Sequence, residues 1–226
     1  MFEAEDVVKL DIGVEVDGYV ADNAQSKYLG TDPNWHRLVE ASAAGLGAAL
    51  ETVGPGVKVH EVSAVIEAAI EAHGYRPVYN LTGHGVARWK VHTSPQIPAS
   101  PDRGDSFIFE PGMVVAIEPF ATNGRGQVTE QGRGEVFSMR REPRKMKLID
   151  PAVWEKIEGM NGLPFARRTF GNLPKDAVES TLARLIRIGC LAVYPPLADP
   201  DHSVRISQTE HTVIITDDGC EVITRA

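Results

Sequence analysis

The sequence predicts an α+β fold, in which strands at both ends of the chain flank two amphipathic helices and a separate helical segment. Three observations favour it. Asp17-Gly18 lies between two apolar, β-rich segments, and this dipeptide tolerates the positive φ of a tight hairpin turn. Apolar residues recur at helical spacing between residues 32 and 73. Strand patterns return from residue 204, and Asp217-Asp218-Gly219 predicts a second hairpin at the end.

The first hairpin, residues 7–22, is expected to place two aspartates on one face. A turn at Asp17-Gly18 sets Gly13 opposite Asp22, and Asp11 shares the face of Gly13 because side chains alternate along a strand. Two converging carboxylates repel each other, and a divalent cation relieves that repulsion. On this stretch alone, two solvated acids remain the alternative. The opposite face is predicted to pack against the core through Val8, Leu10, Ile12 and Val14.

Two helices are predicted after the hairpin. The first runs from the capping residue Asp32, followed by Pro33, to about residue 51, and the second covers residues 59–73 before Gly74. The chain then becomes irregular and rich in glycine and histidine until about residue 100. A turn at residues 110–112 leads into an apolar strand, residues 113–120, which carries one acid, Glu118. A lone carboxylate in such a strand is costly unless it is paired or binds a metal.

Residues 140–201 differ in texture from the rest of the chain. They show no strand alternation, and residues 151–159 and 174–188 have helical patterns. We therefore expect a small helical insertion at 140–201, within a main domain formed by residues 1–139 and 202–226.

Charge and composition restrict the partners. The net charge of −8 argues against a nucleic-acid partner. The nearest basic feature is interpreted as a solvated connector and consists of Arg140, Arg141, Arg144, Lys145 and Lys147. There is no apolar run long enough for a bilayer and no leader at Met1. We therefore expect no membrane partner. Cys190 and Cys220 lack metal-type spacing and are too few for a disulfide scaffold, so we expect a cytoplasmic protein.

Five polar residues stand where strands or tight glycine loops should carry apolar ones. They are Asp11, Asp22, His84, Glu118 and Glu210. His84 lies between Gly83 and Gly85, where missing side chains permit a close approach. Four carboxylates and one imidazole suit two divalent ions of the Mn, Fe, Co or Zn kind. Four negative charges balance two dications and leave room for a hydroxide, whereas one ion would leave excess negative charge.

Four segments resemble those of a known family. The strings KLDIGVEVDGYVADNA, GHGVARWKVHTSPQIP, FEPGMVVAIEPFAT and TEHTVIIT look like those of type II methionine aminopeptidases. This is the archaeal and eukaryotic class, with the pita-bread (creatinase/aminopeptidase) fold. The resemblance covers nearly the whole chain. Residues 140–201, with LPFARR and Tyr194-Pro195, are similar to the insertion that distinguishes type II from type I enzymes.

The resemblance implies roles for individual residues. Asp22 and Glu210 would bridge two metal ions, Asp11 would bind one, and His84 and Glu118 would bind the other. His92 falls where the family has a histidine that contacts the substrate near the scissile amide. The implied reaction is the removal of the initiator methionine from a nascent peptide when the next residue is small. It is a two-metal hydrolysis, for which aminopeptidases are a standard example.

The sequence also departs from the family pattern. The family has an upstream segment of helices and a first strand, with another active-site histidine, and no counterpart precedes the hairpin here. We therefore expect an N-terminally shortened fold, reduced activity and self-association through an uncovered sheet edge. Smaller departures are Glu15, where the family often has histidine, and Thr93-Ser94, where it often has Ala-Gly.

Two other functions remain open at this stage. One is a non-catalytic pita-bread protein that binds metal, nascent chains or a ribosomal partner, with the basic run near Arg144 as its contact. The other is a proline-specific dipeptidase of the same fold. The type II-like insertion and the absence of a glutamate after His92 argue against the dipeptidase.

Overall fold

The computed structural model describes residues 1–101 and 106–225. The chain forms two compact units, which are described separately. The first consists of Met1–Val128 and Asp199–Ala226, and the second of Thr129–Ala198. Helices and antiparallel strands occur in both, as the α+β prediction requires. Within the described residues, no helix is both long and apolar enough to cross a membrane.

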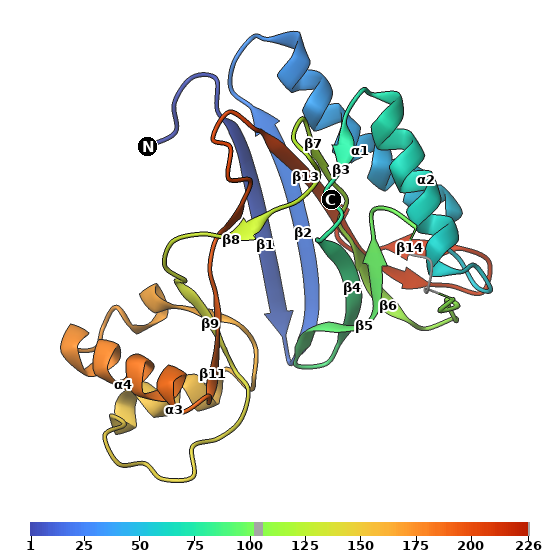
Figure 1. The fold of residues 1–226 in the computed structure, drawn as a ribbon. Coiled ribbons are helices and arrows are strands. Elements are labelled where there is room, and N and C mark those ends of the chain that lie inside the picture. Colours follow the sequence, from blue (N-terminus) through green and yellow to red (C-terminus); the bar gives the residue numbers. More distant parts are fainter. Residues whose placement is uncertain (102–105, 226) are drawn as a thin grey trace. The chain divides into compact units, whose positions relative to one another are not determined.

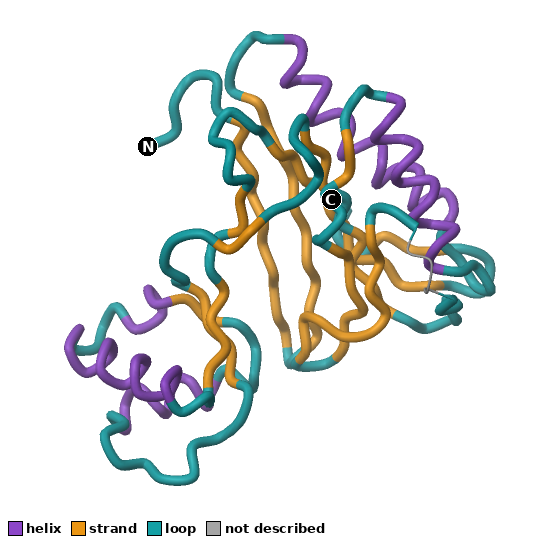
Figure 2. Tube along the Cα trace, in the orientation of Figure 1, coloured by secondary structure: helices purple, strands orange, loops and turns teal. Residues whose placement is uncertain are grey.

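An antiparallel sheet forms the centre of the first unit (Figures 1 and 2). Its strands follow the order β1, β2, β13, β6, β4 and β5, with the bounds Val7–Val16, Tyr19–Tyr28, Ile206–Ile215, Val114–Ile117, Thr82–Ala87 and Lys90–Pro98. Beside this path, β14 (Cys220–Val222) pairs with β13, and β7 (Phe120–Thr122) pairs with β13 and β3 (Arg76–Pro77). Strand β13 is thus the central strand, which contacts both the first hairpin and the middle of the chain.

The first hairpin has the predicted register. Asp17 and Gly18 adopt positive φ values of 52° and 85°, as a tight turn requires. Gly13 lies opposite Asp22, and Val16 lies opposite Tyr19. The turn chemistry therefore fixes the pairing of the two strands over their whole length.

Both predicted helices of this unit are present, and they lie on the same side of the sheet (Figure 1). Helix α1 (Pro33–Thr52) begins where the Asn34 backbone N–H donates to the Asp32 carboxylate at 2.8 Å. Helix α2 covers Val59–Ala72. Their apolar stripes pack on the sheet in one core, which includes Leu38, Leu46, Val62, Ile66, Ile70, Val115, Ile117, Val213 and Ile215.

The prediction that the apolar face of β1 packs against the core is wrong. Leu10, Ile12 and Val14 do lie on the face opposite Asp11, but their exposed fractions are 64%, 50% and 55%, and Val8 is only partly buried. Helix α1 packs on β13, β2 and β7, and α2 packs on β5 and β3. The helices thus cover the other strands and leave Leu10, Ile12 and Val14 exposed to solvent.

The predicted strand 113–120 is two strands. Strand β6 ends at Ile117 and β7 begins at Phe120. Pro119 lies between them, and proline has no N–H group to donate to a sheet ladder. Central strand β13 pairs with both strands. Glu118 lies in the break between them.

The second unit combines helices with short strands. Helices α3 (Pro151–Gly159) and α4 (Lys175–Arg187) confirm the two helical patterns. They pack with the 3-10 turn Arg167–Phe170 around an apolar core. The sequence patterns did not predict the sheet formed by β9 (Val136–Met139), β10 (Phe165–Ala166) and β11 (Leu191–Tyr194), or the pair β8 (Thr129–Glu130) and β12 (Leu197–Ala198).

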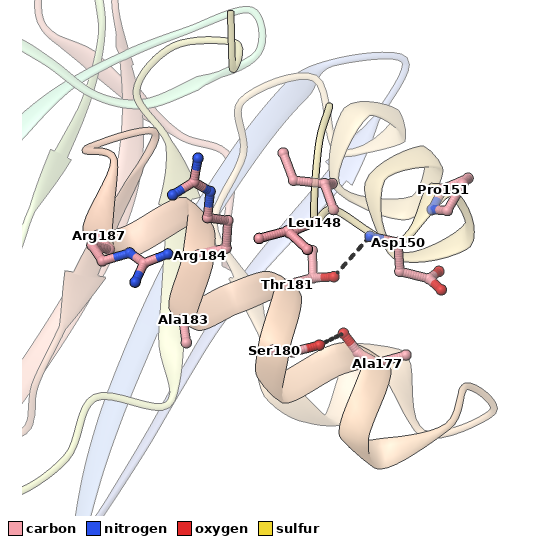
Figure 3. A pocket seen from close by; sticks show the side chains of 10 residues that line it. Leu148, Asp150, Pro151, Ala177, Ser180, Thr181, Ala183, Arg184 and Arg187 are labelled. Carbon is pink, nitrogen blue, oxygen red and sulfur yellow. Dashed lines mark hydrogen bonds between the residues drawn. The ribbon is translucent and has the colours of Figure 1, made fainter. Parts of the chain in front are cut away.

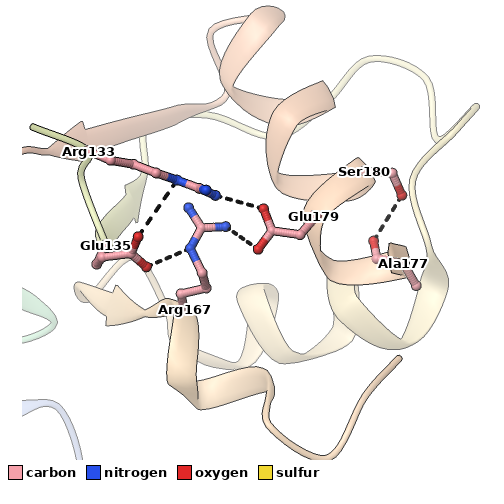
Figure 4. A network of polar contacts seen from close by, with 6 residues as sticks. All are labelled: Arg133, Glu135, Arg167, Ala177, Glu179 and Ser180. Carbon is pink, nitrogen blue, oxygen red and sulfur yellow. Dashed lines mark hydrogen bonds and ion pairs between the residues drawn. The ribbon is translucent and has the colours of Figure 1, made fainter. Parts of the chain in front are cut away.

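An ion-pair network joins the segment before β9 and the 3-10 helix Arg167–Phe170 to helix α4 (Figure 4). Glu179 on α4 accepts from Arg167 at 2.6 Å and from Arg133 at 2.8 Å, and Glu135 contacts the same two arginines. Because Arg133 is mostly exposed, each pair stabilises the unit by at most about 1 kcal/mol.

Candidate metal centre

The sheet register arranges the predicted site residues in two rows. Residues directly opposite each other on neighbouring strands share a face. Ala24 on β2 lies opposite both Asp11 on β1 and Glu210 on β13. The small Ala24 side chain thus separates two carboxylates that lie in one row across three strands.

The second row lies one step further along the same face. Ala116 on β6 lies opposite both Thr212 on β13 and His84 on β4. Asp22 is tied to this row because Thr212 Oγ1 accepts from its backbone N–H and donates to its carbonyl, both at 2.8 Å. These rows lie on the sheet face opposite the helices, since Val213 and Ile117 point into the helical core.

The structure brings three of the predicted residues into one cluster. A ligand atom from each of Asp22, His84 and Glu210 lies within 4.8 Å of the other two. Glu118 joins them, because its Oε1 lies 3.6 Å from Nε2 of His84. His84 and Glu210 are buried, with exposed fractions of 4% and 2%.

Asp11 lies at the open side of the cluster. Its residue is exposed, unlike the other four. Gln208 connects it to Glu118, since Nε2 of Gln208 donates to Oδ2 of Asp11 at 3.1 Å and to Oε2 of Glu118 at 3.2 Å. All five predicted residues therefore face one site on the first unit.

The carboxylates strongly disturb one another. Burial, and then the charges of Asp11 and Asp22, raises the pKa of Glu118 to about 8. Burial, and then the charges of Glu118, Asp22 and Asp11, raises the pKa of Glu210 to about 10. The pKa of Asp22 is raised by burial and by Asp11. Burial and the neighbouring His92 lower the pKa of His84 to about 4, so its imidazole is neutral at pH 7.

His92 stands beside this cluster. Its ring centroid lies 4.3 Å from that of His84, at an interplanar angle of 67°. Both rings line a pocket of about 710 Å³ together with Thr82, Thr93, Ser94, Pro95, Gln96 and Phe107. A molecule in this pocket would contact His92 at the margin of the carboxylate cluster.

The glycines around His84 permit a close approach of backbone. A Cβ atom at Gly83 would meet the carbonyl oxygen of Ala116, and one at Gly85 would meet that of Ser94. The sequence predicted a close approach at these positions. The approaching groups are the strands on either side, β6 and β5, which hold His84 between them.

The donor set fits divalent cations. In the part of the chain that the structure describes, no hydrogen-bond donor reaches the carboxylate of Glu210, although this side chain is buried. A carboxylate with little access to water and no protein donor is stabilised by a nearby cation. Hard oxygen donors with one neutral imidazole suit the divalent metals of the first transition row.

Sequence reasoning missed three residues that support this cluster. Gln208 bridges two carboxylates, Thr212 fixes the backbone of Asp22, and the positive charge of Lys9 opposes the rise in the pKa of Glu118. Each lies two residues from a predicted site residue on the same strand, at Glu210 or at Asp11. The alternation of strand side chains is the signal that could have found them.

The comparisons with known proteins agree with this geometry. Residues 1–217 match metallopeptidase family M24. A methionine aminopeptidase of Archaeoglobus fulgidus is 41% identical over 226 residues, and the match covers 99% of this chain and 74% of that protein.

Two solved structures show the fold. A methionine aminopeptidase of Thermotoga maritima superposes with a TM-score of 0.67 at 23% identity, over 100% of this chain and 66% of that chain. A thermophilic Arx1 superposes with a TM-score of 0.81 at 16% identity, over 98% and 67%. The chain thus spans about three quarters of its curated relative and about two thirds of these structures, and it has the predicted pita-bread fold. It belongs to metallopeptidase family M24, a family of metal-dependent hydrolases.

Proposed function

We propose that this chain is a dinuclear-metal aminopeptidase of the type II class, which removes the N-terminal methionine from nascent proteins. One observation carries the proposal: four carboxylates and a neutral imidazole converge on one face of the sheet, and within the described residues no protein donor reaches the carboxylate of Glu210. Relatives that are 35–41% identical over nearly the whole chain, each named methionine aminopeptidase, support the substrate.

The proposed ligand roles are those that the family resemblance implies. Asp22 and Glu210 would hold both ions, and their place in the cluster that includes His84 supports this role. Asp11 would bind one ion from the open side. His84 and Glu118 would bind the other, which is supported by their separation of 3.6 Å. This assignment leaves Gln208 to orient Asp11 and Glu118 from behind.

The chemistry divides between the ions and the chain. When bound, divalent ions acidify water and polarise the scissile carbonyl. The peptide N-terminus enters the pocket beside the cluster, and His92 contacts the substrate near the scissile amide. An imidazole there can exchange a hydrogen bond with the amide as it breaks. The neutral imidazole of His84 can serve as a ligand because it carries no proton on one nitrogen.

Hydrolysis of a Met-Ala-Ser peptide with added Mn²⁺ or Co²⁺ tests the proposal. We expect methionine release by the unchanged chain, and its loss in Asp22→Ala and Glu210→Ala. Glu221→Ala, at an exposed glutamate of β14 in the same sheet, is the matched control and should keep full activity. Absence of release with every metal would contradict the proposal.

The second candidate is a non-catalytic pita-bread protein that binds metal, nascent chains or a ribosomal partner. The exposed basic run at residues 140–147 favours it, because hydrolysis gives this run no role. Metal binding without hydrolysis would support this candidate.

A further inference from the structure

The two units of the chain carry opposite net charges. The unit Thr129–Ala198 has 12 lysines and arginines against 8 acids, which gives +4. The remainder has 11 against 23, which gives −12, and together they make up the −8 of the whole chain. The net charge of −8, which argues against a nucleic-acid partner, is thus the sum of two unlike parts. Such an asymmetry within one chain is a recognised sign of a polyanion-binding region.

Within the positive unit, basic side chains converge on one pocket. A cavity of about 590 Å³ is lined by Arg141, Arg144, Lys145 and Arg184, together with Ile188 and Cys190. The first three come from the basic run and the fourth from helix α4, about 40 residues further along the chain. Among the residues that the structure describes, no acidic side chain lines this cavity. Like charges gathered in this way repel one another, and a bound anion would remove the repulsion.

One of the four cations already has a structural role. Arg141 donates from Nε to the carbonyl oxygen of Gly189 at 3.3 Å and from Nη2 to that of Ile188 at 2.5 Å. It therefore closes the C-terminal end of α4, where free carbonyl groups and the helix dipole favour a cation.

Within the described residues, the side chains of the other three cations have no protein partner. Across the described residues, no acid pairs with Arg144, Lys145 or Arg184. The Nε atom of Arg184 is moreover buried without any hydrogen-bond partner. A buried guanidinium donor normally has an acceptor, so an acceptor outside the chain is indicated at this cavity.

A second cavity continues the basic surface. It has a volume of about 740 Å³ and shares Arg184 with the first (Figure 3). Arg187 also lines it, and Figure 3 shows both arginines projecting from the last turns of α4. The acid in its lining, Asp150, accepts from the backbone N–H groups of Ala152 and Val153 and so caps α3. We call the two cavities the α4 groove.

We propose that the α4 groove binds the phosphodiester backbone of single-stranded RNA. Two adjoining cavities that share one arginine suit the consecutive phosphates of a strand, whereas a single small anion would fill only one. Arginine guanidinium groups also match phosphate oxygens in fork geometry. Leu148 lines the second cavity and is 70% exposed, so it can contact bases that a single strand leaves uncovered.

Fluorescence anisotropy with a labelled RNA of about 20 nucleotides tests this proposal, and the salt dependence of binding is the readout. We expect Arg144→Glu and Lys145→Glu each to weaken binding at least tenfold at low salt. Each should also lower the slope of log K against log salt by about 0.7, the value for one lost single-strand contact. Lys175→Glu is the matched control: an exposed lysine at the other end of α4 undergoes the same charge change.

The outcomes separate the possible ligands. Equal weakening by Lys145→Glu and Lys175→Glu would overturn the proposal, because it would show attraction by net charge alone. Absence of RNA binding at low salt would overturn it too, and so would full competition by equimolar inorganic triphosphate, which would identify a small-anion site. An acidic peptide that binds more tightly than RNA would place a protein in the groove. The Met-Ala-Ser assay on Lys145→Glu tests the peptidase separately.

Discussion

The imidazole of His84 faces the carboxyl group of Glu118, with Nε2 at 3.6 Å from Oε1. The two do not form an ordinary ion pair at pH 7. Burial lowers the pKa of His84 to about 4 and raises that of Glu118 to about 8, so a neutral ring faces a protonated carboxyl group. A divalent cation would take the place of that proton and draw on both groups. This relationship gives the folding stability of the metal-free chain an unusual pH dependence.

The metal-free protein should lose stability as the pH rises from 7 towards 8.5, according to proton linkage. Burial raises the pKa values of Glu118 and Glu210 from 4.5 to about 8 and about 10. The folded chain therefore holds protons that the unfolded chain has lost. Their stabilising effect is complete below about pH 4.5 and disappears as the pH passes each folded pKa, at up to about 1.4 kcal/mol per pH unit for each group.

Urea unfolding in EDTA at several pH values measures this effect. His84 has the opposite sign, because its lowered pKa makes stability rise between about pH 4 and 6.5, and it does not act above that range. Glu118→Gln should reduce the slope between pH 7 and 8 and leave the contribution of Glu210, whose pKa is raised to about 10. Stability that rises over this interval in the unchanged chain would contradict the assigned shifts.

Gln208→Leu should weaken metal binding by roughly 10- to 100-fold, as expected for a residue that orients ligands. Its amide holds Asp11 and Glu118 through two hydrogen bonds, and leucine provides none. Titration with Mn²⁺ measures the change. Gln25→Leu, at an exposed position of the adjacent strand β2, is the control and should leave the affinity unchanged. Equal Mn²⁺ affinities of the two variants would show that Gln208 does not orient the metal ligands.

Gly85→Ala should lower the free energy of unfolding by about 1–3 kcal/mol, the usual cost of overpacking. The added methyl group would collide with the backbone of Ser94, so β4 and β5 must separate and shift His84. Gly47→Ala in helix α1, where the methyl group meets no atom within 4 Å, should instead stabilise by up to about 1 kcal/mol. Denaturant titration of both variants measures the free energy of unfolding. An unchanged value for Gly85→Ala would contradict the close packing of Gly85 against Ser94.

The sequence predicts the residues of the metal site better than it predicts which strands the helices cover. Turn chemistry at Asp17-Gly18 sets the hairpin register, and the register alone puts Asp11 and Asp22 on one face. Whether Leu10 on the other face is covered depends on where α1 packs, which strand alternation does not record. Gln208 was missed because a buried glutamine has no pattern of its own. The division at Pro119 was readable, since proline rarely continues a central strand.

The exposed apolar face of β1 predicts self-association. In the described part of the chain, β1 pairs with β2 on one edge only, and Leu10 and Ile12 are at least half exposed. Open edges and apolar patches both favour contact between copies. Sedimentation velocity should show a mass that rises with concentration, and Ile12→Lys should shift it towards the monomer. Leu29→Lys, at an exposed leucine beyond the end of β2, should have no such effect. A monodisperse monomer at every concentration would contradict this prediction.

The number of metal ions bound per chain tests the central claim most directly. Equilibrium dialysis of the full chain against Mn²⁺, followed by metal analysis, should give two ions per chain at saturation. Asp22→Ala and Glu210→Ala should each bind fewer than two, because each removes a proposed bridging carboxylate, whereas Glu221→Ala should still bind two. Saturation at one ion, or two ions retained by Glu210→Ala, would contradict a dinuclear centre built from these residues.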